Sequence, residues 1–123
     1  ADALFAFGKS DLNAISVAGR QSLDNLINRI KDEYVTVNSM RIMGHADPLG
    51  HAPANDKLST ERALTIRNYL LANGLQGTRI DSEGRGSREP VVTTCPAIPT
   101  PTSIACNQPN RRVVVEITGA ARQ

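Results

Sequence analysis

Apolar and polar residues follow one another in patterns that divide the chain into helix-like and strand-like segments. In residues 14–31 apolar side chains recur at helical spacing, with charged and amide side chains between them. A second helix is expected over residues 60–73, with Ser59 as its N-cap and an Asn-Gly stop signal after it. The strand-like pattern slips in period near Ser39, which indicates a β-bulge. Strands are expected at residues 4–7, 34–44, 79–83 and 110–118.

The order of these elements is β-α-β-α-β-loop-β, which indicates an α+β sandwich with helices packed on a mixed four-stranded sheet. A loop rich in glycine and proline is expected at residues 44–57, and a proline-rich loop is expected at about 91–109. The length of 123 residues suits one domain over residues 1–123. Aromatic residues make up only 3%, so we expect a core of Val, Ile, Leu and Ala.

Composition and charge exclude several classes of protein. The net charge is +2, and the 14 basic and 12 acidic residues are interspersed, so no nucleic-acid partner is expected. No segment approaches the roughly 20 apolar residues of a transmembrane helix, and no secretory signal is visible. A strand-like run follows Ala1 almost at once, so we expect a mature fragment or an excised domain.

The two cysteines, Cys95 and Cys106, lie in the loop expected at about 91–109, where the prolines argue against helix and central strand. A disulfide between them would close the loop and stabilise the fold by roughly 3 kcal/mol. It would also favour an oxidising compartment such as the periplasm. The alternative is two reduced cysteines in a cytosolic protein. Zinc is not expected, because the close pairs of ligands typical of zinc motifs are lacking.

Arg62 and Asp47 are the candidates for ligand binding. Arg62 falls within an apolar arc of about 140° on the second helix. It also falls in the expected first turn, where the helix dipole disfavours a cation. Asp47 follows the second strand, where α/β folds often place ligand groups. Asp47 could bind an ammonium while Arg62 and the helix N-terminus bind a carboxylate. The alternatives are an internally paired or solvent-reaching Arg62 and an Asp47 that caps its loop.

Other motifs are weaker. Gly8-Lys9-Ser10 lacks the earlier glycine of a phosphate-binding loop. His45, Asp47 and His51 have no regular metal-ligand spacing, so no metal or other cofactor is expected. Neither a nucleophile beside His45 nor a catalytic motif is evident, so we expect a protein that is not an enzyme.

Taken together, these residues resemble the OmpA-like peptidoglycan-binding domain. The family pattern is similar to Gly-His-Thr-Asp, then Gly, then Asn-x-x-Leu-Ser-x-x-Arg-Ala, and its spacing from Asp47 to Arg62 is kept without a gap. The resemblance extends to the opening strand and to Asn110-Arg111-Arg112 before the last one. Two departures are Ala46, where many members have Thr, and Ala6, where some carry a polar or acidic residue. The matching core residues are Gly44, His45, Asp47, Gly50, Asn55, Leu58, Ser59, Arg62, Ala63, Ile66 and Leu70.

The resemblance implies non-covalent binding of peptidoglycan through the diaminopimelate of its peptide stem. Asp47 and Arg62 would contact the free amino-acid end of diaminopimelate, Asn55 would order the loop, Leu58 would line the pocket and Phe7-Gly8 would form the opposite rim. Ala46 would lie beside Asp47 without the usual hydroxyl. Arg111 and Arg112 would either help the site or form a salt bridge at the start of the strand.

The cysteine-bearing loop is similar to that of OmpA-type outer-membrane proteins. This implies a periplasmic domain of a Gram-negative bacterium that anchors the outer membrane to the cell wall, with a β-barrel N-terminal to it in the full-length protein. Two alternatives remain: a structural or dimerisation domain with Arg62 paired internally, and a cell-wall peptide hydrolase. A second copy of the chain, forming a homodimer, is a further candidate partner.

Overall fold

The computed structural model describes residues 2–75 and 79–121. Two short 3-10 helices, η1 (Leu12–Ala14) and η2 (Gln108–Asn110), accompany the main elements. Along the chain these are β1 (Asp2–Leu4), α1 (Val17–Glu33), β2 (Tyr34–Gly44), α2 (Ala52–Ala72), β3 (Arg79–Gly84), α3 (Pro101–Cys106) and β4 (Arg112–Ala121).

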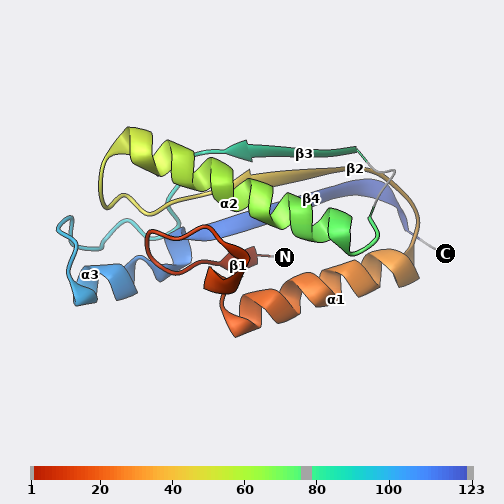
Figure 1. Ribbon diagram of the computed structural model, residues 1–123, viewed down its shortest axis with the longest axis horizontal. Helices are drawn as coiled ribbons and strands as arrows, with labels where there is room; N and C mark the ends of the chain where they lie inside the picture. The colour runs from red at the N-terminus through yellow and green to blue at the C-terminus, as the bar shows by residue number, and fades with distance from the viewer. Residues whose placement is uncertain (1, 76–78, 122–123) are drawn as a thin grey trace.

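The strands form a mixed sheet in the order β1-β4-β2-β3. β4 lies antiparallel between β1 and β2, whereas β2 and β3 run parallel. A parallel pair needs a crossover, and the crossover between β2 and β3 contains α2. In Figure 1, α1 and α2 lie along the sheet, with α2 in front of β2 and β4. The predicted α+β class is confirmed.

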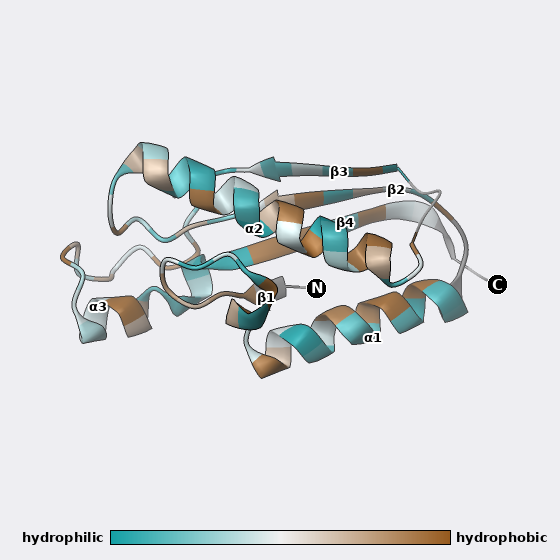
Figure 2. Cartoon of the chain, viewed as in Figure 1, coloured by the Kyte–Doolittle hydropathy of each residue, from teal (hydrophilic) through white to brown (hydrophobic). Residues whose placement is uncertain are grey.

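One hydrophobic cluster joins both long helices to a single face of the sheet. On β2, the buried Met40 and Ile42 alternate with Arg41, which forms an ion pair with Glu83 on the opposite face. Figure 2 shows the matching alternation of hydrophobic and hydrophilic segments along α1 and α2. The core is mostly aliphatic as expected, although Phe5 and Met40 are also buried in it. Its helical members are Leu23, Leu26, Ile27, Ile30, Ala63, Ile66 and Leu70.

α2 begins at Ala52 rather than near residue 60, so the predicted loop over residues 44–57 is too long. Pro53 lies in the first turn, where a missing N–H breaks no intrahelical hydrogen bond, so it is compatible with the helix. The prediction of Ser59 as N-cap is wrong, because His51 holds that position. Ser59 is buried within the helix, where its hydroxyl donates to the Asp56 carbonyl and accepts from the Gly86 N–H.

The expected first strand at residues 4–7 lies earlier, at Asp2–Leu4. The chain turns directly afterwards, and the Lys9 N–H donates to the carbonyl of Ala6 at 3.2 Å. The bulge expected near Ser39 is confirmed, since the register of β2 with β4 shifts between Val37 and Ser39. The remaining predicted elements agree with the structure to within a few residues at their ends.

Two glycines bring α2 unusually close to the sheet. Gly44 ends β2 and pairs with Gly84 on β3. A Cβ at Gly44 would lie 1.9 Å from the carbonyl oxygen of Ser59, and one at Gly84 would lie 2.5 Å from the backbone N of Thr60. Because side chains at these positions would displace the helix backbone, the two glycines fix where α2 crosses the ends of β2 and β3.

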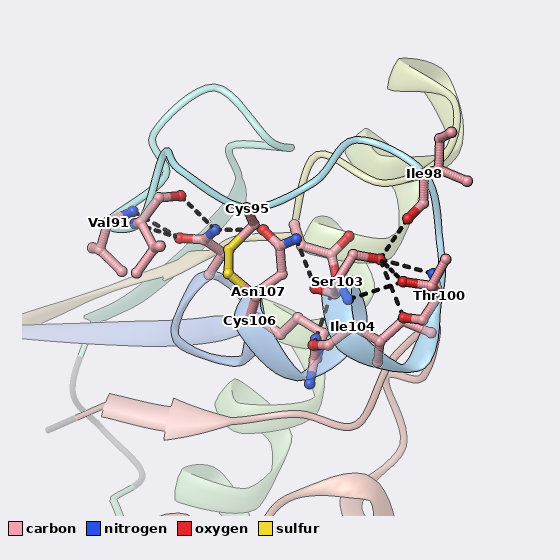
Figure 3. Close-up of a disulfide and its surroundings, with 12 residues drawn as sticks. Val91, Cys95, Ile98, Thr100, Ser103, Ile104, Cys106 and Asn107 are labelled. Atoms are coloured by element: carbon pink, nitrogen blue, oxygen red, sulfur yellow. Dashed lines mark hydrogen bonds and ion pairs between the residues drawn. A yellow bond between two sulfur atoms is a disulfide. The ribbon is translucent and has the colours of Figure 1, made fainter.

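The expected disulfide between Cys95 and Cys106 is present. The expectation that prolines keep this region free of helix is wrong, because α3 begins at Pro101. Proline is tolerated at a first helical position, and Thr100 and Ser103 form a reciprocal capping box there. Figure 3 shows the disulfide beside Asn107 and the hydrogen bonds of Ser103.

Candidate functional site

A cleft of about 440 Å³ opens where the loop after β2 meets the first turns of α2. The turn that follows β1 forms its other side through Phe7 and Gly8. Of the residues predicted to bind ligand, Asp47, Asn55, Leu58, Phe7 and Gly8 line the cleft. Ala46 and Arg62 do not line it. The lining is completed by Leu49, Gly50, His51, Ala54, Lys57 and Glu61.

Asp47 contributes a nearly buried carboxylate to the cleft, and the residue is only 4% exposed. Its Oδ1 accepts a hydrogen bond from the Leu49 N–H at 3.0 Å, which orders the loop locally. Its Oδ2 lies 3.5 Å from Nη1 of Arg111, and both side chains are buried. Of the two roles weighed for Arg111, the structure shows a salt bridge, and its partner is Asp47.

Arg62 lies in the third turn of α2 instead of the first, because the helix starts at Ala52. It has no exposed surface, and burial lowers the pKa of its guanidinium to about 10. The Asp47 carboxylate opposes this shift and the charge of Arg111 adds to it. At neutral pH, Arg62 is therefore a buried cation near Asp47.

The described hydrogen bonds of Arg62 all go to backbone carbonyls. Nε donates to Lys9 at 2.9 Å, Nη1 to His45 at 3.0 Å and Nη2 to Ala6 at 3.2 Å. The guanidinium carbon also lies 5.3 Å from the centre of the Phe5 ring. Ala6 and Lys9 flank Phe7-Gly8, so Arg62 holds the turn that forms one rim of the cleft.

The N-terminus of α2 borders the cleft through His51, Ala54 and Asn55. The first N–H groups of a helix have no intrahelical acceptor and carry partial positive charge, which favours an anion. Asn55 is buried at 6% exposure beside this end. Ala46 is buried behind the cleft, and its N–H donates to the Gly86 carbonyl at 2.9 Å.

Sequence reasoning missed several lining residues. Lys57 and Glu61 are four residues apart and share one face of α2 with Leu58, so helical spacing would have identified them had the helix been started at Ala52. In the described part of the chain, no group of three or more His, Cys, Asp or Glu side chains is placed to hold a metal ion. Likewise, no described helix is long and apolar enough to cross a membrane.

Fold and cleft together define an α+β domain with a charged, ligand-sized site. The sequence profile of the OmpA family matches residues 4–98, and the chain belongs to this family. It is 34% identical over 121 residues to outer membrane protein A of Serratia odorifera, covering 96% of this chain and 49% of that protein. With outer membrane protein A of Klebsiella aerogenes it shares 33% identity, covering 96% of this chain and 33% of the relative. The chain thus spans between a third and a half of these relatives.

Solved structures show the same fold. The OmpA-like domain of FopA1 from Francisella tularensis superposes with a TM-score of 0.72 at 23% identity, covering 99% of this chain and 72% of that one. The cell wall anchor of the T6SS from Pseudomonas aeruginosa gives 0.66 at 27% identity, covering 97% and 76%. The peptidoglycan-associated lipoprotein from Burkholderia pseudomallei gives 0.68 at 18% identity, covering 95% and 89%.

Proposed function

We propose that this domain binds peptidoglycan non-covalently through the diaminopimelate of the peptide stem, without catalysing a reaction. Membership of the OmpA family supports this proposal. So do two structural neighbours, one described as peptidoglycan-associated and the other as a cell wall anchor. The single observation that carries it is the buried carboxylate of Asp47, which faces a cleft bordered by the start of a 21-residue helix.

The free end of diaminopimelate carries an ammonium and a carboxylate on one carbon. In the proposed complex, Asp47 accepts hydrogen bonds from the ammonium, and the carboxylate faces the N-terminus of α2. Arg62 and Arg111 are both buried near Asp47, so these three groups sum to one net positive charge. The carboxylate of the ligand would lie in the field of this buried positive charge, while its ammonium would face the carboxylate of Asp47.

The other lining residues suit the rest of the ligand. Leu58 and Phe7 offer apolar surface to the methylene groups of diaminopimelate, and Phe7 is 40% exposed. Gly8 has a φ of 69°, in the left-handed region that favours glycine, so the rim there is backbone. Ala46 shapes the loop behind Asp47, and Asn55 flanks the helix start.

We further propose that the domain acts in the periplasm of a Gram-negative bacterium and anchors the outer membrane to the cell wall. The relatives named outer membrane protein A are two to three times as long as the matched part, which supports an additional outer-membrane β-barrel in the full-length protein. A homodimer is a further proposal for the full-length protein.

A second candidate function is a purely structural or dimerisation domain in which Arg62 is paired internally. The observation that favours it is that each of the three guanidinium nitrogens of the fully buried Arg62 donates to a backbone carbonyl. In that case the role of Arg62 is to hold the turn at Phe7-Gly8, and the cleft needs no ligand.

Asp47→Ala separates the two candidates. We expect co-sedimentation with purified sacculi to fall at least about tenfold, because losing one partner of a desolvated charge contact costs ~2–5 kcal/mol. The matched control is Asp81→Ala, which removes an exposed carboxylate on β3 whose partner is Arg79. It should bind like wild type. Equal binding by Asp47→Ala and wild type would contradict the proposal and favour the structural role.

A further inference from the structure

Arg111 connects three segments that are far apart in the sequence. Its Nε donates to the carbonyl of Phe5 at 2.9 Å, directly after the end of β1. Its Nη1 donates to the carbonyl of Ile104 at 2.7 Å, in α3, and lies 3.5 Å from Oδ2 of Asp47. Arg111 is 6% exposed and does not line the cleft, so it contacts Asp47 without being part of the cleft wall.

The carbonyl of Ile104 is available to Arg111 because of where it lies in α3. The last four carbonyls of a helix have no intrahelical partner, and α3 runs only from Pro101 to Cys106. Cys106 is also bonded to Cys95, so the disulfide fixes the end of α3 two residues beyond Ile104. Figure 3 shows Ile104 on α3 next to this disulfide.

Buried hydrogen bonds hold the same loop from inside. The side chain of Asn110 accepts from the N–H groups of Val91 and Val92 and donates to Oδ1 of Asn107 at 2.8 Å. Asn107 in turn donates to the carbonyl of Ser103 at 3.0 Å. The loop therefore offers Arg111 a fixed acceptor rather than a mobile one.

We propose that Arg111 is a positioning residue for Asp47, and that the disulfide-closed loop holds Arg111 in place through the carbonyl of Ile104. A nearly buried carboxylate needs a compensating cation, and a guanidinium can serve two carbonyls and a carboxylate at once. The proposal rests on the proposed function, because Asp47 matters for binding only if the cleft takes a ligand with an ammonium group.

Arg111→Met tests the first link. It removes the charge but keeps most of the apolar volume, and the control is Arg112→Met at the neighbouring position, the first residue of β4. We expect the Kd for a synthetic stem tripeptide containing diaminopimelate, measured by calorimetry, to rise at least about tenfold, which corresponds to ~1.4 kcal/mol. The control should stay within about twofold of wild type. An unchanged Kd for Arg111→Met, with wild type binding, overturns the inference and leaves the proposed function standing.

A ligand-free measurement tests positioning directly. The Leu49 N–H donates to Oδ1 of Asp47, so its hydrogen exchange reports whether that carboxylate is held. We expect exchange at Leu49 to accelerate at least about tenfold in Arg111→Met and not in Arg112→Met. Unchanged Leu49 exchange overturns the inference. Accelerated exchange in a protein that binds no stem peptide supports the positioning role and contradicts the proposed function alone.

A double-mutant cycle with Asp47→Asn distinguishes positioning from general structural support. If Arg111 acts through Asp47, Arg111→Met should change Kd by less than about twofold once Asp47 is Asn, because the coupled group is already gone. Additive losses from the two substitutions would assign Arg111 a structural role instead and overturn the inference.

The disulfide supplies the second link and a variant that leaves Arg111 in place. In the double variant Cys95→Ser, Cys106→Ser, we expect faster Leu49 exchange and a Kd raised about threefold or more. When the two serine substitutions are introduced into Arg111→Met, they should not raise its Kd any further. If Arg111→Met does not fold, the Leu49 exchange and the Kd of this serine variant test the inference instead. Wild-type exchange and Kd in the serine variant would overturn the role of the loop.

Discussion

Replacing Arg62 by alanine should destabilise the fold strongly. The side chain is fully buried in α2, and its three hydrogen bonds tie the helix to the turn after β1 and to the end of β2. Arg62→Ala removes all three, abolishes the contact with the Phe5 ring and leaves a cavity.

The magnitude follows from opposing contributions. Three hydrogen bonds from a charged donor, at about 1.5–3 kcal/mol each, set an upper limit of roughly 5–9 kcal/mol. Desolvation of the guanidinium, several kcal/mol, is no longer incurred and offsets part of this loss. Ala6 and Lys9 lie in an exposed turn, so water can reach their freed carbonyls. We expect a net loss of about 3–5 kcal/mol in the free energy of unfolding.

Urea unfolding followed by circular dichroism measures this loss, with Arg79→Ala as the control. Arg79 forms an exposed ion pair with Asp81, so its removal should change the free energy of unfolding by less than about 1 kcal/mol. A loss below about 1 kcal/mol for Arg62→Ala would refute the reasoning, since it would mean that these bonds contribute little to holding the cleft together.

Two further predictions concern the scaffold. Gly44→Ala should lower the free energy of unfolding by at least about 2 kcal/mol in urea titrations, because its Cβ would lie 1.9 Å from the Ser59 carbonyl oxygen; a near-neutral effect would contradict the close approach of α2. The pKa of Glu83 lies below its ordinary value because Arg85 and Arg41 donate hydrogen bonds to its carboxylate. The contribution of ionised Glu83 to the free energy of unfolding is therefore present above about pH 4.5 and is lost as pH falls through the lower folded-state pKa. Glu83→Gln should flatten this decline of stability at acid pH, and an unchanged pH dependence of stability would count against the ion pairs.

Much of the fold was predictable because local patterns decide it. Alternation along β2 and helical spacing along α1 each bury one side of an element, so periodicity identified both. The bulge near Ser39 was visible as a slip in that alternation. The disulfide was expected because both cysteines lie in one proline-rich loop.

Proline content misled the prediction twice, for the same physical reason. Pro53 and Pro101 both lie in the first turn of a helix, where proline is favourable, whereas the sequence pattern predicts a loop around each of them. Because of this error, α2 is predicted to start at about residue 60, which places Arg62 in its first turn. Lys57 then falls in a predicted loop and is not identified as a residue that lines the cleft.

The partners of the site residues could not be read from sequence. Asp47 and Arg111 are 64 residues apart, and Arg62 bonds to carbonyls, which every residue carries. The apolar arc on α2 drew attention to Arg62 and left a buried and a solvent-reaching side chain as alternatives; the structure buries it, and only the fold shows which acceptors surround it.

Chemical-shift mapping of the isotope-labelled domain tests the central claim most directly. Titration with a stem tripeptide that contains diaminopimelate should shift the amide signals of Gly8, Asp47, Asn55 and Leu58 around the cleft, and should leave α1 unchanged. A lysine-containing tripeptide, which lacks the second carboxylate, should cause much smaller shifts. Shifts on another surface, or none at millimolar peptide, would contradict the account.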